Sequence, residues 1–174
     1  MNKKVIKQYR TFFVLFVVFT LLFVAHTSVG AVNLLESKRQ VNGSFLFQKG
    51  VFTHHWNDKF NDDTDLYSLE YYSYNNWLYG VAKFQNSFYQ PSWYVYTGKD
   101  YSLKEISKLQ IRGKVTAGIM HGYDDENGKY DAVITKFKTF PIIIPSLKIV
   151  YRRFELDVVA LAHEGFMITT GIRF

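Results

Sequence analysis

The residues from Lys108 to Met120 alternate between apolar and polar side chains, and this alternation constrains the fold more than any other feature of the sequence. The first set is apolar and consists of Leu109, Ile111, Val115, Ala117 and Ile119. The second set is polar and consists of Lys108, Gln110, Arg112, Lys114 and Thr116. Because successive side chains of a β-strand point to opposite faces, the pattern predicts a strand with one apolar and one polar side.

Further segments of similar length fill the chain from residue 44 to its last residue. We expect strands at 44–54, 66–74, 77–88, 92–98, 107–120, 142–151, 154–162 and 166–174. Turn signals separate most of them: Asn75-Asn76, Gln90-Pro91, residues 124–128 and Glu164-Gly165. The last strand ends on an apolar aromatic residue, Phe174, which resembles the assembly signal of bacterial outer-membrane barrels. Eight antiparallel strands is an even number, as closed bacterial barrels require.

The start of the chain has the composition of a secretory signal peptide. A basic stretch is followed by an apolar run from Thr11 to Ala25 and by small residues from Ser28 to Ala31. We expect residues 1–31 to be removed, 32–43 to form a periplasmic segment, and 44–174 to form the barrel. Loss of the basic stretch lowers the formal net charge from +6 to about +2, so the high pI is no argument for a nucleic-acid partner.

The chain is unusually aromatic, at 18% Phe, Trp and Tyr, and it contains no Cys. Tyr and Trp favour membrane interfaces, and a closed barrel satisfies every backbone group in lipid. We therefore predict an all-β, eight-stranded antiparallel transmembrane β-barrel, with a secreted lipocalin-like barrel or β-sandwich as the alternative. A barrel of eight strands is too narrow for a water channel, so its interior is filled or holds one small ligand. Long outer loops are expected at 55–65 and 123–129.

Three stretches resemble motifs of the lipid A palmitoyltransferases of the Gram-negative outer membrane. Thr53-His54-His55 is similar to a Thr-x-His motif at the end of the first strand. Phe84-Gln-Asn-Ser-Phe88 is similar to a Phe-x-Asp-Ser-aromatic motif, and Phe140-Pro-Ile-Ile-Ile-Pro145 to a proline-bounded sixth strand. The resemblance covers residues 50 to 174. It implies an enzyme that moves a palmitoyl chain from a phospholipid to lipid A, with the acyl chain held inside the barrel.

The resemblance also implies which residues act. His55 matches the family histidine, Ser87 the family serine, and Asn86 stands where better-known members have Asp. Asn can orient a histidine but cannot stabilise its charge. Two alternatives follow: this chain does without the acid, or Asp58, Asp62 or Asp63 of the neighbouring loop takes its place.

Residue chemistry leads to matching expectations. Acyl transfer to a hydroxyl needs a base, oxyanion donors and the exclusion of water. A histidine suits the first role, and the resemblance favours His55, with His54 on the opposite side of the strand. The alternative is that both histidines belong to the aromatic girdle at the membrane interface. Ser87 can be a nucleophile or donate a hydrogen bond to the oxyanion, and the Asn86 amide can also donate one. Gly80 and Ala82 share a face with Leu78 and could leave room for an acyl chain, so Gly80→Met should shorten the preferred chain.

The basic residues leave two alternatives open. Arg112, Lys114, Arg152 and Arg153 could bind lipid A phosphates, or they could belong to solvated strand ends or to a charge network in the lumen. His121 and His163 lack spaced partners, so no metal site is expected, and the sequence suggests no cofactor. The partners implied are a phospholipid donor and a lipid A acceptor in the membrane, with a monomer as the default state.

Two rival functions remain at this stage. A lipid A deacylase is another small barrel enzyme with His and Ser, but its His-x-Ser pattern is absent at His54, His121 and His163. A non-catalytic barrel for adhesion or membrane integrity would need no pairing of His55 with Ser87.

Overall fold

The computed structural model describes residues 43–57, 60–63, 65–126, 136–162 and 164–174. The expected signal peptide at 1–31 lies outside the described residues, as does all of the 32–43 segment except Gly43. Among the described residues, no helix is long and apolar enough to cross a membrane.

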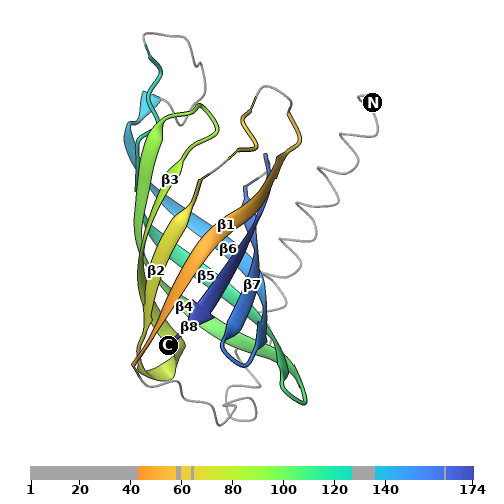
Figure 1. The fold of residues 1–174 in the computed structure, drawn as a ribbon. Coiled ribbons are helices and arrows are strands. Elements are labelled where there is room, and N and C mark those ends of the chain that lie inside the picture. Colours follow the sequence, from red (N-terminus) through yellow and green to blue (C-terminus); the bar gives the residue numbers. More distant parts are fainter. Residues whose placement is uncertain (1–42, 58–59, 64, 127–135, 163) are drawn as a thin grey trace.

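The chain forms a closed antiparallel barrel in which each strand pairs with its neighbours in sequence and β1 pairs with β8 (Figure 1). The strands are β1 (Ser44–His55), β2 (Tyr67–Tyr72), β3 (Trp77–Gln85), β4 (Pro91–Ile106), β5 (Leu109–His121), β6 (Thr139–Tyr151), β7 (Phe154–Leu161) and β8 (Gly165–Arg173). A short 3₁₀ turn, η1 (Tyr74–Asn76), joins β2 to β3. The predicted eight-stranded antiparallel barrel is confirmed.

The barrel carries apolar side chains on its outside and polar ones inside, the reverse of a soluble protein. Strand β2 illustrates the pattern. Its exposed residues are Tyr67, Leu69 and Tyr71, whereas its buried residues are Ser68, Glu70 and Tyr72. In β5, the predicted polar face of Gln110, Arg112, Lys114 and Thr116 lies buried in the lumen.

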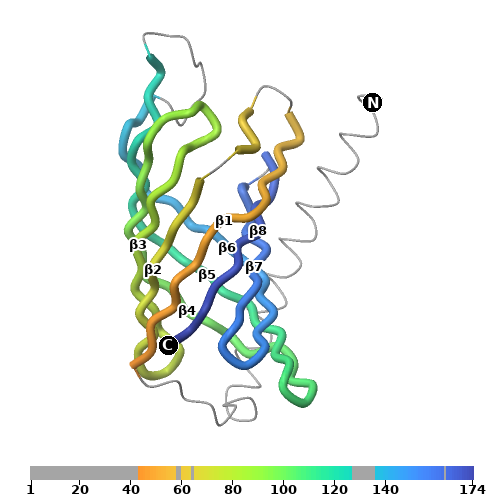
Figure 2. Tube along the Cα trace, in the orientation of Figure 1, coloured from red at the N-terminus to blue at the C-terminus, as the bar shows by residue number. Residues whose placement is uncertain are grey.

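The two ends of the barrel differ in their connections (Figures 1 and 2). At one end, β2–β3, β4–β5 and β6–β7 are joined by turns of a few residues. At the other end, longer segments join β1 to β2 and β5 to β6, and shorter ones join β3 to β4 and β7 to β8. We call these the turn end and the loop end.

A network of eight charged side chains, seven of them buried and Arg173 partly buried, fills the middle of the lumen. Its carboxylates are Glu70, Asp100, Glu155 and Asp157, and its cations are Arg112, Lys114, Lys148 and Arg173. Lys148 lies 2.8 Å from Asp100 and 2.7 Å from Glu155. Lys114 lies 2.9 Å from Glu70 and 2.6 Å from Asp157. The lumen is therefore divided into two cavities, one toward each end.

Candidate functional site

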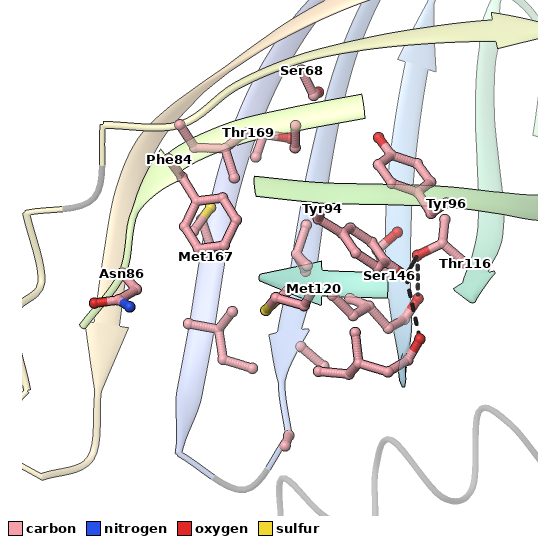
Figure 3. A pocket seen from close by; sticks show the side chains of 18 of the residues that line it. Ser68, Phe84, Asn86, Tyr94, Tyr96, Thr116, Met120, Ser146, Met167 and Thr169 are labelled. Carbon is pink, nitrogen blue, oxygen red and sulfur yellow. Dashed lines mark hydrogen bonds between the residues drawn. The ribbon is translucent and has the colours of Figure 1, made fainter. Parts of the chain in front are cut away.

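The cavity at the loop end has a volume of about 480 Å³, within the range of about 300–1,000 Å³ typical of small-molecule sites. Most of its walls are apolar, and Phe84, Met120 and Met167 face its centre (Figure 3). Asn86 lies at one end of the view, and Thr116 and Ser146 lie at the other. Glu70, Lys114 and Asp157 of the charge network also contribute to its lining. The cavity is thus a long apolar space with a polar floor.

An irregularity in β1 decides which histidine enters this cavity. The pairing of β1 with β8 shifts between Gly50 and Phe52, where one extra residue forms a bulge. The buried positions are even-numbered before the bulge and odd-numbered after it. Because a shift of one residue exchanges the two faces of a strand, His55 is buried and lines the cavity.

His54 consequently lies on the other face of β1. Its ring packs edge-on against Trp56, with ring centroids 5.0 Å apart, and also against Phe166. This is the aromatic packing expected for the histidine that does not face the lumen. The two adjacent histidines therefore occupy different environments.

Asp62 is the acid that contacts the buried histidine. Its Oδ1 lies 2.9 Å from Nδ1 of His55 and accepts a hydrogen bond of 2.8 Å from the His55 backbone N–H. In the tautomer in which Nδ1 of His55 donates a hydrogen bond to this carboxylate, Nε2 has a free lone pair and can act as a base. Asp58, one of the three acids expected as substitutes, lies outside the described residues. Of the other two, Asp62 is the one that lies at hydrogen-bonding distance from His55.

Ser87 lines the same cavity from the β3–β4 loop. Its carbonyl accepts a hydrogen bond of 3.0 Å from the N–H of Asn61, which joins this loop to the β1–β2 loop. Phe60 packs against His55 and against Phe88, with centroids 5.5 Å apart in both pairs. His55 and Ser87 are thus brought to one cavity by contacts between the two loops.

Tyr123 also lies at this cavity, and its hydroxyl interacts with Ser87. Burial raises the pKa of the Tyr123 phenol to about 12. The hydrogen bond with the Ser87 hydroxyl lowers this pKa, but its effect is smaller than that of burial. The phenol therefore stays protonated near neutral pH. It can donate a hydrogen bond, but it is no candidate for the base.

The amide of Asn86 was expected to donate a hydrogen bond to an oxyanion, but in the structure it is already hydrogen-bonded within the protein. Its NH₂ group already donates to the side chains of Gln90 and Ser92 and to the carbonyl of Gly122, at 3.1–3.2 Å. Its side-chain oxygen accepts from the N–H groups of Phe88 and Gln90. Because these contacts occupy the whole amide, the structure gives Asn86 the role of holding the β3–β4 loop that carries Ser87.

Gly80 also differs from its expected role. A Cβ atom at this position would lie 2.4 Å from the ring of Tyr96, so the absent side chain makes room for that ring and not for a ligand. Tyr96 is held there by stacking on Tyr94 and by donating a hydrogen bond of 2.9 Å to Glu70. Ala82, two residues along β3, is buried and lines the cavity as expected.

We expect Gly80→Ala to destabilise the barrel by about 1–3 kcal/mol, because the methyl group must displace a packed ring. Urea-induced unfolding in detergent measures this change. In a Tyr96→Ala background the same substitution should cost much less, since the ring is gone. Equal stability of Gly80→Ala and the unaltered protein would show that the ring can move without cost.

Arg112 and Lys114 belong to the charge network and not to an exposed phosphate site at the loop end. Both are buried, and Arg112 Nε donates a hydrogen bond of 2.7 Å to Asp100. Their burial fits the second of the two alternatives, a charge network in the lumen. Arg152 and Arg153 form the turn between β6 and β7, far along the barrel from the His55 cavity.

Within the described part of the chain, no three His, Cys, Asp or Glu side chains are grouped to hold a metal ion. His121 lies 2.6 Å from the Thr139 hydroxyl and stacks on Trp93. His163 lies outside the described residues.

Together these features define the class of protein as an eight-stranded antiparallel β-barrel with an apolar internal cavity and a contact between the buried His55 and the half-exposed Asp62 at its loop end. No protein-family model matches the sequence, and no curated protein matches it. Among solved structures, the fold is similar to Ail, the attachment invasion locus protein of Yersinia pestis, determined with the heparin analogue sucrose octasulfate. The TM-score is 0.33 and the identity 13%, over 76% of this chain and 99% of that one.

Proposed function

We propose that this protein is an outer-membrane acyltransferase that moves a long acyl chain from a phospholipid to lipid A. The observation that carries the proposal is the pairing of His55 with Asp62 at an apolar cavity inside the barrel that Ser87 also lines. A base beside an acyl-sized apolar space is what transfer between two lipids requires.

The outer surface supports a location in a membrane. Large apolar side chains are exposed around the barrel, among them Phe47, Leu69, Val81, Val95, Ile119, Ile143 and Leu156. A closed barrel with an apolar outside and a polar inside is the β-structure that a bilayer can accommodate. With the secretory composition of residues 1–31, this supports the outer membrane of a Gram-negative bacterium.

The barrel wall also supports lateral access for a lipid. Between the described strands β6 and β7, pairing extends only from Ser146↔Val159 to Tyr151↔Phe154, so residues 139–145 of β6 have no β7 partner. Pro141 and Pro145 remove two N–H donors from that part of β6. Ile143 and Val159, on the two sides of this gap, both line the cavity. An acyl chain could therefore pass from the bilayer into the cavity without leaving apolar surroundings.

The chemistry follows from the placement of the side chains. Nε2 of His55 takes the proton from a lipid A hydroxyl, and the oxygen attacks the carbonyl carbon of the phospholipid ester. The hydroxyls of Ser87 and Tyr123, which line the same cavity, donate hydrogen bonds to the oxyanion that forms. The C–O bond to the glycerol then breaks, and the imidazolium returns the proton to the leaving oxygen. The products are acylated lipid A and a lysophospholipid.

The proposal is tested with purified protein in mixed micelles that contain a phospholipid labelled in its acyl chain, with and without lipid A. The expected result is labelled lipid A, formed only when both lipids are present. Labelled free fatty acid alone would indicate a hydrolase. Loss of an acyl chain from lipid A would indicate the deacylase, and no product would favour a barrel without chemistry.

Ala82 offers a test of the acyl cavity itself. Ala82→Met fills part of the cavity, so we expect the enzyme to prefer shorter acyl chains, measured by competition among phospholipids of graded chain length. Val81→Met is the matched control, because the side chain of Val81 points to the outside of the barrel. An identical preference in both variants would place the acyl chain elsewhere.

A non-catalytic barrel for adhesion or membrane integrity is the second candidate. The similarity to Ail agrees with it only through the name of that protein, because a TM-score of 0.33 carries no argument about function. The apolar outside and the charge network in the lumen fit it equally well. The His–Asp contact at the cavity favours the enzyme.

A further inference from the structure

A second cavity, of about 390 Å³, opens at the turn end of the barrel on the far side of the charge network. Its lining differs from that of the first cavity, because four arginines contribute to it: Arg112, Arg152, Arg153 and Arg173. The carboxylates in its lining are Asp100 and Glu155. The proposed acyl transfer uses none of these residues.

Both carboxylates are already paired with cations. Lys148 lies between them, within 2.8 Å of Asp100 and 2.7 Å of Glu155. Asp100 also accepts a hydrogen bond from Arg112, and Glu155 accepts one from Arg173. Four arginines therefore face two side-chain carboxylates in the lining of this cavity, and Lys148 behind the lining adds a further cation, which leaves an excess of positive charge.

Several guanidinium donors in the cavity are not used within the protein. The two terminal nitrogens of Arg112 have only long contacts, 3.5 Å to Gln110 and 3.4 Å to Asn76, at the outer limit of hydrogen bonding. Arg152 and Arg153 form no ion pair with any described residue, and Arg152 lies over the ring of Tyr151 at 5.5 Å. These donors are available to a ligand.

The surroundings hold these groups in place. The guanidinium of Arg173 lies 3.9 Å from the centroid of the Tyr72 ring. The backbone N–H of Arg173 donates a hydrogen bond of 2.7 Å to the backbone carbonyl of Arg153. The turn between β6 and β7 is thereby attached to β8. A group of guanidinium donors suits an anion with several acceptor oxygens, because each guanidinium can form two parallel hydrogen bonds.

We propose that the turn-end cavity binds a phosphate group, held by Arg152 and Arg153 at its mouth and by Arg112 at its inner side. A phospholipid headgroup and a soluble phosphate share this chemistry. The site lies beyond the charge network from His55, so it is independent of the proposed acyl transfer.

Isothermal titration calorimetry on the full-length protein in an uncharged detergent tests the proposal, with inorganic phosphate in one arm and short-chain phosphatidic acid in the other. The Arg152→Gln/Arg153→Gln double variant should lose at least about tenfold in affinity, since hydrogen bonds from charged donors are removed. The control is Lys104→Gln/Lys108→Gln, which removes the same charge at the neighbouring β4–β5 turn outside the cavity. The control should bind like the unaltered protein.

The two arms distinguish the source of the phosphate. Saturable binding of inorganic phosphate supports a soluble ligand, whereas binding of phosphatidic acid alone supports a lipid headgroup. The proposal is overturned if neither ligand saturates, or if both double variants lose affinity equally, because net charge alone would then explain the binding. A heat-resistant folded form on gels verifies that each variant is intact.

Discussion

His55→Ala is expected to lower the rate of acyl transfer by about 100- to 10,000-fold, the range contributed by a general base. The substitution removes the imidazole whose Nδ1 contacts Asp62, and no other described imidazole lines the cavity. The barrel itself should persist, because the hydrogen bond from the backbone N–H of residue 55 to Asp62 does not need the ring. The rate is measured with the labelled phospholipid and lipid A, on protein that retains its heat-resistant form.

Two further variants make this test specific. His54→Ala removes the neighbouring ring, which packs against Trp56 outside the cavity and lies 3.9 Å from the other carboxylate oxygen of Asp62, and should lower the rate far less than His55→Ala. Asp62→Ala should slow transfer by less than His55→Ala, because the ring keeps Nε2 but loses its orienting carboxylate. A rate that is equal in His54→Ala and His55→Ala would remove His55 from the reaction.

Lys148→Met should destabilise the barrel by about 3–5 kcal/mol, the usual effect of removing one partner of a buried ion pair. The ammonium group is fully buried between Asp100 and Glu155, and methionine fills a similar space without charge. Each carboxylate would keep one arginine but lose the cation that they share. Urea unfolding monitored by tryptophan fluorescence measures the change.

Lys83→Met is the matched control for this substitution. Lys83 is an exposed residue of β3 and takes no part in the charge network. We expect its replacement to change stability by less than about 0.5 kcal/mol, as is usual for surface positions. If Lys148→Met were as stable as Lys83→Met, the network would fill the lumen without contributing to its stability.

Most of the barrel could be predicted from the sequence, because strand alternation is a local signal. The alternating residues of β5 and the turn at Arg152-Arg153 lie where the pattern predicts them. Strand β4 is the main difference, since it continues to Ile106 and not only to residue 98. Gly98, Lys99 and Asp100 have the composition of a turn, but Asp100 is an inward residue satisfied by Lys148, a partner that the local sequence does not indicate.

The candidate site was less predictable, because it depends on contacts between segments far apart in sequence. The bulge near Gly50 that turns His55 inward is defined by the register with β8. The choice of Asp62 among three nearby acids depends on how the β1–β2 loop folds back on His55. The ring that fills the space at Gly80 comes from Tyr96 on the next strand. The sequence does indicate that some carboxylates face the lumen, since Glu70, Glu155 and Asp157 each lie between two apolar residues of a strand.

Mass spectrometry of lipid A from cells that produce either the unaltered protein or His55→Ala tests most directly whether the His55 cavity performs acyl transfer. The predicted result is lipid A that gains the mass of one palmitoyl group with the unaltered protein and gains none with the variant. Unchanged lipid A in both strains, with both barrels folded in the outer membrane, would contradict the proposed function and leave a barrel without this chemistry.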